Sequence, residues 1–108
     1  IKGWNIKKNK AKIGMGIHKF NDPKLREDFS ENEYKIDVTE FHNYAAEWTK
    51  TKIVFLIDNV IVKEINQSPD YPMQFMLGIY EIPDKMINKP ERKYPKEFIV
   101  DYVKGYRE

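Results

Sequence analysis

Histidine, serine and cysteine, which commonly carry acyl-transfer or zinc chemistry, are few or absent in this chain. It has two histidines, His18 and His42, and no cysteine. The acids near these histidines do not fall at metal-ligand spacing, so we expect no zinc site. Ser30 and Ser68 are the only serines, and neither lies in a nucleophile-elbow context. No glycine-rich phosphate loop precedes a helix, so neither acyl nor phosphoryl transfer is expected.

Carboxylates are plentiful, and a pair of them could hydrolyse a glycosidic bond. Retaining hydrolysis needs two carboxyl groups about 5–5.5 Å apart. On one strand such a pair would have even spacing, as in a Glu-x-Asp-x-x-Glu run in which a bulge corrects the last position. The chain has no such run. Glu81 and Asp84 are the nearest acidic pair at an expected strand end, and we favour their interpretation as solvated loop charges. We therefore predict no catalytic residue.

The elements that must position these groups are predicted to be strands. Seven Tyr, six Phe and two Trp accompany many Ile and Val and few Leu and Ala, a composition that suits a pleated surface. A length of 108 residues allows one domain or part of one. The net charge of +2 argues against a nucleic-acid partner, and the lack of a membrane-length apolar run argues against a membrane partner. Because the sequence opens on Ile1, we expect an excised segment.

Turn residues divide the chain into an expected series of strands, which predicts an antiparallel sandwich or barrel. The run 52–58 is apolar on both faces and is expected to be a central strand. Asp58 and Asn59 tolerate positive φ and predict a two-residue type I′ hairpin. Asn21, Asp22 and Pro23 break the pattern, and an acidic loop is expected from there to Asn32. A long irregular stretch is expected over 83–96. The expected strands are 12–19, 34–38, 41–49, 52–58, 60–65, 73–79 and 97–106.

The strand expected over 12–19 has one apolar face and one small, open face. Gly14, Gly16 and His18 alternate there with three apolar residues. In-strand glycines commonly mark a bulge, or the close approach of a ligand or of another backbone. This strand is therefore the first candidate for a functional surface.

Four blocks of sequence are specific enough to compare with known families. They are FHNYAAEWT at 41–49, IVFLIDNVIV at 53–62, YPMQFMLGIY at 71–80 and YPKEFIVDYVKGY at 94–106. Together they resemble the C-terminal half of glycoside hydrolase family 16, the laminarinase and lichenase relatives. The resemblance covers 12–106 and implies an all-β, concanavalin A-like jelly roll, with residues 1–108 as a single partial domain. It also implies that the family's catalytic carboxylates would precede residue 12.

The resemblance also implies which residues line a sugar cleft. Gly16 and His18 match positions on the strand that follows the catalytic one, and Gly78 and Tyr80 match positions at the end of a later strand, beside Glu81. Many relatives carry Asn and Trp where this chain has Gly78 and Tyr80, so the substrate preference of the lichenases is not transferred. A stacking role for Tyr80 remains, since an aromatic face suits the apolar side of a sugar.

Three further residues carry alternative interpretations. Tyr44 and Trp48 could be sugar platforms, but they share a strand face and are expected to lie in the core. Asp101 matches a carboxylate that holds a structural calcium in some relatives, and an outward-facing strand carboxylate is the alternative. No cofactor is otherwise required. Calcium takes six to eight oxygen ligands, so Asp101 alone would bind it weakly.

The resemblance implies a secreted or cell-surface parent enzyme that hydrolyses a β-glucan or galactan. This chain would supply part of the polysaccharide cleft and would be inactive alone. Two alternatives stay open. One is a non-catalytic carbohydrate-binding sandwich, and the other is a module that self-associates through unpaired strands.

Overall fold

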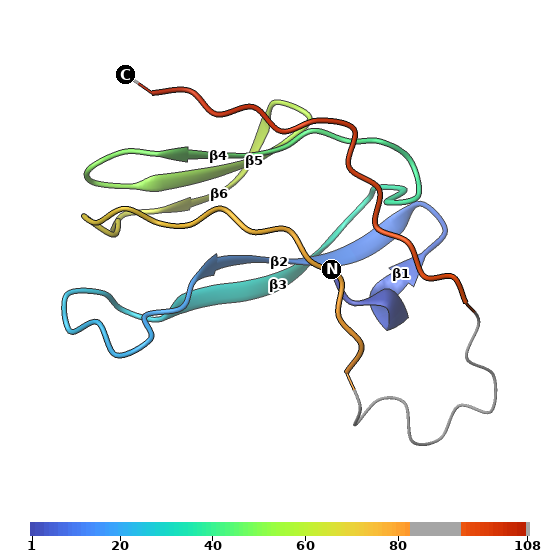
Figure 1. Cartoon of the computed structure of the whole chain (residues 1–108), viewed down its shortest axis with the longest axis horizontal. Helices are drawn as coiled ribbons and strands as arrows, with labels where there is room; N and C mark the ends of the chain where they lie inside the picture. Colours follow the sequence, from blue (N-terminus) through green and yellow to red (C-terminus); the bar gives the residue numbers. More distant parts are fainter. Residues whose placement is uncertain (83–93, 108) are drawn as a thin grey trace. The chain divides into compact units, whose positions relative to one another are not determined.

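Six short strands form two antiparallel sheets in the computed structural model, which describes residues 1–82 and 94–107. The chain divides into two units, Ile1–Tyr71 and Pro72–Glu108, and these strands all belong to the first. Figure 1 shows the two sheets as layers of that unit, which confirms the predicted antiparallel β-sandwich. After a 3-10 turn, η1 (Gly3–Asn5), the first sheet has the order β1 (Ile6–Lys7), β2 (Lys10–Ile17), β3 (Asp28–Tyr34), and the second has the order β4 (Tyr44–Trp48), β5 (Ile53–Ile57), β6 (Val60–Ile65).

The core of the first unit lies between the two sheets. Alternate residues of β2 point inward and are buried, as the period-two pattern of the sequence predicts. The opposite sheet meets them with Ile57 of β5 and Ile65 of β6. Burying each such side chain contributes about 1.5–3 kcal/mol, so these few residues hold the layers together. The buried residues are Ala11, Ile13, Ile17, Leu25, Ile36, Val54, Ile57 and Ile65.

A lysine ties the two sheets together beside this core. Lys63 lies on β6, and its side chain is only 14% exposed. Its ammonium contacts the Asp28 carboxylate at 2.9 Å and donates to the Ser30 hydroxyl at 3.0 Å and the Met15 carbonyl at 3.1 Å. All three acceptors belong to the first sheet, so a single charged side chain replaces hydrophobic contact at this point.

The predicted hairpin between β5 and β6 is present. Ile57 pairs with Val60 across the turn, and the two residues between them both have positive φ, 49° at Asp58 and 65° at Asn59. Type I′ turns require positive φ at both positions, which Asp and Asn tolerate better than most residues. The expected central place of β5 in its sheet is also confirmed.

The strand expected over 34–38 is wrong, because β3 ends at Tyr34 and occupies the stretch that was expected to be an acidic loop. β3 is an edge strand whose side chains are mostly exposed, so no apolar alternation marks it in the sequence. Its pairing with β2 comes from backbone hydrogen bonds, with Gly16 opposite Phe29. The neighbouring strand, β2, begins and ends two residues earlier than expected.

The strands expected over 73–79 and 97–106 are also wrong. The described residues of the second unit, 72–82 and 94–107, contain no strand, and their side chains are exposed. Alternating apolar residues make a strand only where a neighbouring strand satisfies their backbone groups.

The described residues also include no helix with the length and apolar run that crossing a bilayer would need.

Tyr44 and Trp48 face the interior side of their sheet but are not buried. They pair with Ile57 and Ile53, which both contact the core, so all four side chains share one face of the sheet. Tyr44 is nevertheless 49% exposed and Trp48 46% exposed, which overturns the expectation of core burial. The reason is position, since β4 is an edge strand.

Candidate functional site

Two glycines of β2 allow the adjacent strand β3 to approach closely on the outer face of the first sheet. At Gly16, where φ is +151°, an added Cβ would lie 2.1 Å from the Asp28 carbonyl oxygen. At Gly14 it would lie 2.5 Å from the Phe29 ring. Both contacts are below van der Waals distance. Residue 16 needs glycine because backbone atoms and a positive φ block any side chain there, whereas a side chain at residue 14 would displace the Phe29 ring. The close approach expected from the sequence is thus made by the backbone and one ring of β3.

Three rings gather beside these glycines, and we call His18, Phe20 and Phe29 the aromatic cluster. The His18 ring stacks on Phe29, with centroids 4.5 Å apart and planes 25° apart. Phe20 lies 5.7 Å from the His18 ring at a tilt of 58°, and it is 86% exposed. Since apolar rings normally avoid water, an exposed cluster of this kind is typical of a binding surface.

Glu27 fixes one side of the aromatic cluster. Its Oε1 accepts a hydrogen bond from His18 Nδ1 at 2.5 Å, and its Oε2 accepts one from the backbone N–H of Lys19 at 3.0 Å. The Lys19 hydrogen bond and then the His18 hydrogen bond lower the pKa of Glu27, so the carboxylate is ionised near neutral pH. A carboxylate that bonds both the ring and the adjacent backbone restrains where that ring can lie.

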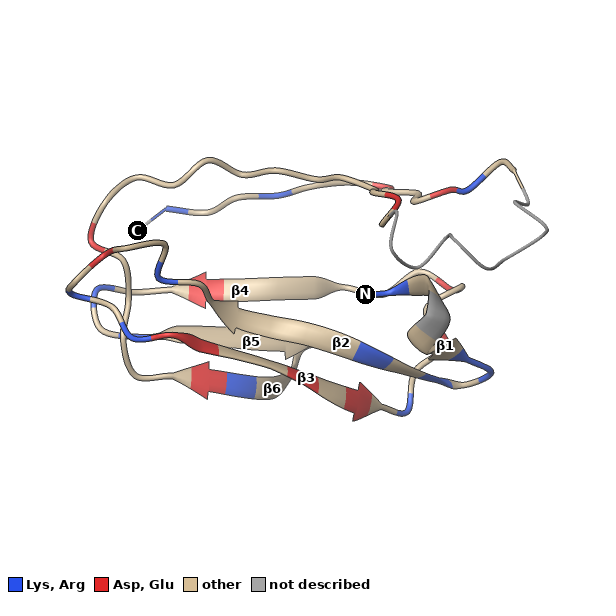
Figure 2. Ribbon diagram, turned by 90° about the horizontal axis from the view of Figure 1, so that it is seen from below, with Lys and Arg blue, Asp and Glu red and all other residues tan. Residues whose placement is uncertain are grey.

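The other carboxylates on the outer face of β3 are paired with lysines. Lys2 contacts Glu31 and Lys10 contacts Glu33, and these contacts lower the pKa of each glutamate. Figure 2 shows the acidic residues of β3 beside a basic residue of β2. The charges of Lys2 and Lys10 are therefore compensated, whereas a site for an anionic polymer needs unpaired cations.

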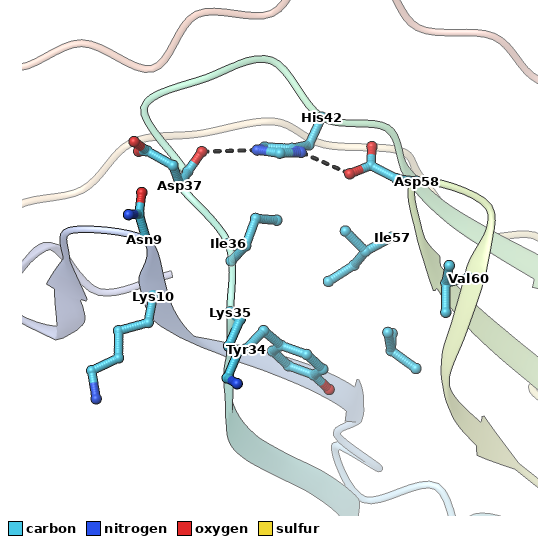
Figure 3. Close-up of a pocket in the computed structure, with 11 residues that line it drawn as sticks. Asn9, Lys10, Tyr34, Lys35, Ile36, Asp37, His42, Ile57, Asp58 and Val60 are labelled. Carbon is cyan, nitrogen blue, oxygen red and sulfur yellow. Dashed lines mark hydrogen bonds and ion pairs between the residues drawn. The ribbon is translucent and has the colours of Figure 1, made fainter.

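His42, the other histidine, is among the residues of the first unit that line a pocket, as Figure 3 shows. Its Nδ1 lies 2.7 Å from the Asp58 carboxylate, and its Nε2 lies 2.8 Å from the Asp37 carbonyl oxygen. The Asp58 carboxylate also accepts the Asn43 backbone N–H at 2.9 Å. His42 thus joins the chain before β4 to the turn between β5 and β6. No serine, threonine or cysteine is among the described residues that line the pocket.

Three other residues predicted to bind substrate lie in the second unit. Tyr80 is 77% exposed, and its hydroxyl lies over Gly78, where an added Cβ would be 2.7 Å away. Glu81 accepts hydrogen bonds from the Tyr94 hydroxyl at 2.6 Å and the Lys96 ammonium at 2.7 Å. The predicted site residues are thus divided, because Gly16 and His18 belong to the first unit. Asp84, the predicted neighbour of Glu81, lies outside the described residues.

Asp101 is exposed in the second unit. Among the described residues, no three acidic or histidine side chains gather closely enough to hold a metal ion. One carboxylate offers at most two of the six to eight oxygens that calcium takes. A calcium site at Asp101 therefore stays a prediction that would need oxygen ligands from other groups.

Phe20, Glu27 and Phe29 were not predicted from the sequence. Phe29 and Glu27 fall in the stretch expected to be a loop, and nothing in the sequence places Phe29 opposite Gly16. The two in-strand glycines were the available signal, since they indicated that something bulky approaches this face.

Comparison with known proteins returned one family. The family model described as "Glycosyl hydrolases family 16" matches residues 8–95 of the chain. No curated protein and no solved structure matches it. The matched region includes the aromatic cluster and Glu27. It also includes His42 and Asp58, which are in contact at the turn between β5 and β6.

Proposed function

The chain belongs to glycoside hydrolase family 16, and we propose that it supplies part of a polysaccharide-binding surface without the carboxylates that cut the polymer. The observation that carries the proposal is the exposed aromatic cluster above the glycines of β2. Stacked rings offer flat apolar faces, and the C–H side of a pyranose is apolar in the same way. The absence of a Glu-x-Asp-x-x-Glu run from the sequence supports the second half of the proposal.

The proposed ligand is a β-linked polysaccharide of the glucan or galactan class. Family membership supports the β-linked class. The lysine-paired carboxylates of β3 favour an uncharged polymer over a sulfated one, because sulfate would meet carboxylates here rather than free cations. Tyr80 in the second unit offers another exposed ring and remains a proposed stacking residue.

Affinity electrophoresis through gels containing laminarin, lichenan or agarose tests this proposal. We expect at least one of these polymers to retard the chain, and the Phe29→Ala variant to bind it roughly twofold to tenfold more weakly. Phe41→Ala is the matched control, because Phe41 is an exposed phenylalanine outside the aromatic cluster and should bind as the parent chain does. A dextran gel controls for non-specific retardation.

The same samples should release no reducing sugar from these polymers. Equal binding by Phe29→Ala and the parent chain would refute the proposed surface. Turnover by the parent chain would instead refute the claim that cutting residues are absent, and the two halves of the proposal can therefore fail separately.

A further inference from the structure

Glu27 is the one carboxylate in hydrogen-bond contact with the aromatic cluster among the described residues. Its two carboxylate oxygens accept hydrogen bonds from two consecutive residues, one from the His18 ring and one from the Lys19 backbone N–H. These groups lie where the chain leaves β2 and turns toward Phe20. One side chain therefore sets both the ring orientation of His18 and the path of the backbone that carries Phe20.

The contact leaves His18 with one orientation. Glu27 is acceptor-only when ionised, so His18 Nδ1 must donate the proton in this hydrogen bond. The ring also has an apolar contact, the stack on Phe29. A hydrogen bond in the ring plane and a stack on the ring face restrain different rotations, and together they hold the imidazole in place.

We propose that Glu27 is a positioning residue for polysaccharide binding, holding His18 against Phe29 and Phe20 beside it so that the aromatic cluster is preformed before the sugar arrives. This rests on the proposed function of the cluster. A preformed surface avoids the cost of ordering side chains during binding, which is about 0.5–1.5 kcal/mol for each mobile one. Glu27 itself need not touch the sugar.

Binding of the full chain to the polymer that retards it tests the role of Glu27. Glu27→Ala is expected to weaken binding about tenfold, because the His18 ring and the Lys19 N–H lose their shared acceptor. Glu27→Met keeps the length of the side chain but has neither carboxylate oxygen, so both donors lose their acceptor and its affinity should fall as far as that of Glu27→Ala. Glu33→Ala is the matched control, since it removes an exposed carboxylate of β3 that pairs with Lys10, away from the rings.

A proton NMR readout separates positioning from a general structural effect. In the parent chain the His18 ring protons should be shifted upfield by the face of Phe29. That shift should be lost in Glu27→Ala and kept in Glu33→Ala, while the circular dichroism spectra of both variants match that of the parent chain.

The outcomes distinguish the two proposals. Weaker binding together with loss of the upfield shift in Glu27→Ala supports the positioning role. If Glu27→Ala binds as the parent chain does while Phe29→Ala loses affinity, the positioning role is wrong and the binding surface stands. If Phe29→Ala also binds normally, both proposals fall. If Glu27→Ala does not fold, Glu27→Met decides, and full affinity with an unchanged shift would overturn the role.

Discussion

His42 is held by two groups that can only accept hydrogen bonds. The Asp58 carboxylate contacts Nδ1 of the ring, and the Asp37 carbonyl oxygen contacts Nε2. Both contacts can be hydrogen bonds only when both ring nitrogens carry protons. The hydrogen bond to Asp58, then the one to Asp37, raises the pKa of His42, while the Asn43 N–H and then His42 lower the pKa of Asp58.

This pair makes stability depend on pH. A pKa raised in the folded state means that His42 stabilises the fold fully below its unfolded value of about 6.5, and that this contribution is lost as pH rises through the folded pKa. We expect the urea midpoint of the parent chain to exceed that of His42→Gln by more at pH 5.5 than at pH 8.5.

The comparison isolates His42, because the two proteins differ at this residue alone. The carboxylates with lowered pKa are ionised at both pH values, so they do not change the difference. A difference between the two proteins that does not vary with pH would contradict the doubly protonated ring.

Individual residues were predictable from the sequence where backbone conformation alone decides their type. Asp58 and Asn59 were recognised as a turn because few residue types accept positive φ. Gly16 was recognised as a place of close approach, but the partner was not, since it depends on register. The contact from Asp58 to His42 was also missed, because the two are 16 residues apart and each has a sufficient local explanation.

Lys63 shows how one strand can hold the opposite sheet through polar contacts. Its three acceptors lie on β2 and β3, and water reaches little of the side chain. Hydrogen bonds to charged groups contribute more than neutral ones, and a well-shielded ammonium has few alternative partners.

We expect Lys63→Met to lower the free energy of unfolding by about 1–2 kcal/mol, measured by urea denaturation. Methionine retains the apolar stem, so the loss reports the ammonium contacts. Lys52→Met is the matched control, because Lys52, which directly precedes β5, pairs with Glu64 of β6 at 2.9 Å where both side chains are exposed. Its loss should stay below about 0.5 kcal/mol, and equal losses in the two variants would refute a special role for Lys63.

The strands differ in how well the sequence predicted them, and burial explains the difference. β2, β5 and β6 contribute to the core and have the expected apolar pattern. β3 pairs through its backbone and leaves most of its side chains exposed, so its sequence is typical of a loop. Residues 73–79 and 97–106 have the pattern of strands, but no ladder forms in the part of the second unit that the structure describes.

The chain as a whole has one unit with a core and another whose described side chains are exposed. Within the first unit, β4 leaves Tyr44 and Trp48 half-exposed on the face that elsewhere forms the core. Edge strands with open apolar faces invite pairing with another copy. Family membership and fold class were predictable from the four sequence blocks, whereas the extent of this uncovered face was not.

We therefore expect the chain to form a dimer or a larger species, measured by light scattering across a dilution series. Trp48→Gln should shift the population toward monomer by reducing the exposed apolar area. A control is Phe20→Ala, which removes an exposed ring from the outer face of the first sheet. A parent chain that stays monomeric at all concentrations would contradict this prediction, and would show that the exposed side chains of β4 do not cause association.

The close approach of β3 to Gly16 also limits how this family member could acquire a new specificity. Even a methyl group at residue 16 would collide with the Asp28 carbonyl, and the positive φ there disfavours every side chain. Mutation cannot easily place a new sugar-contacting group on that part of β2. Change must instead come from Phe29 and from the loop that carries Phe20, so natural variation in ligand choice should concentrate there while residue 16 stays invariant.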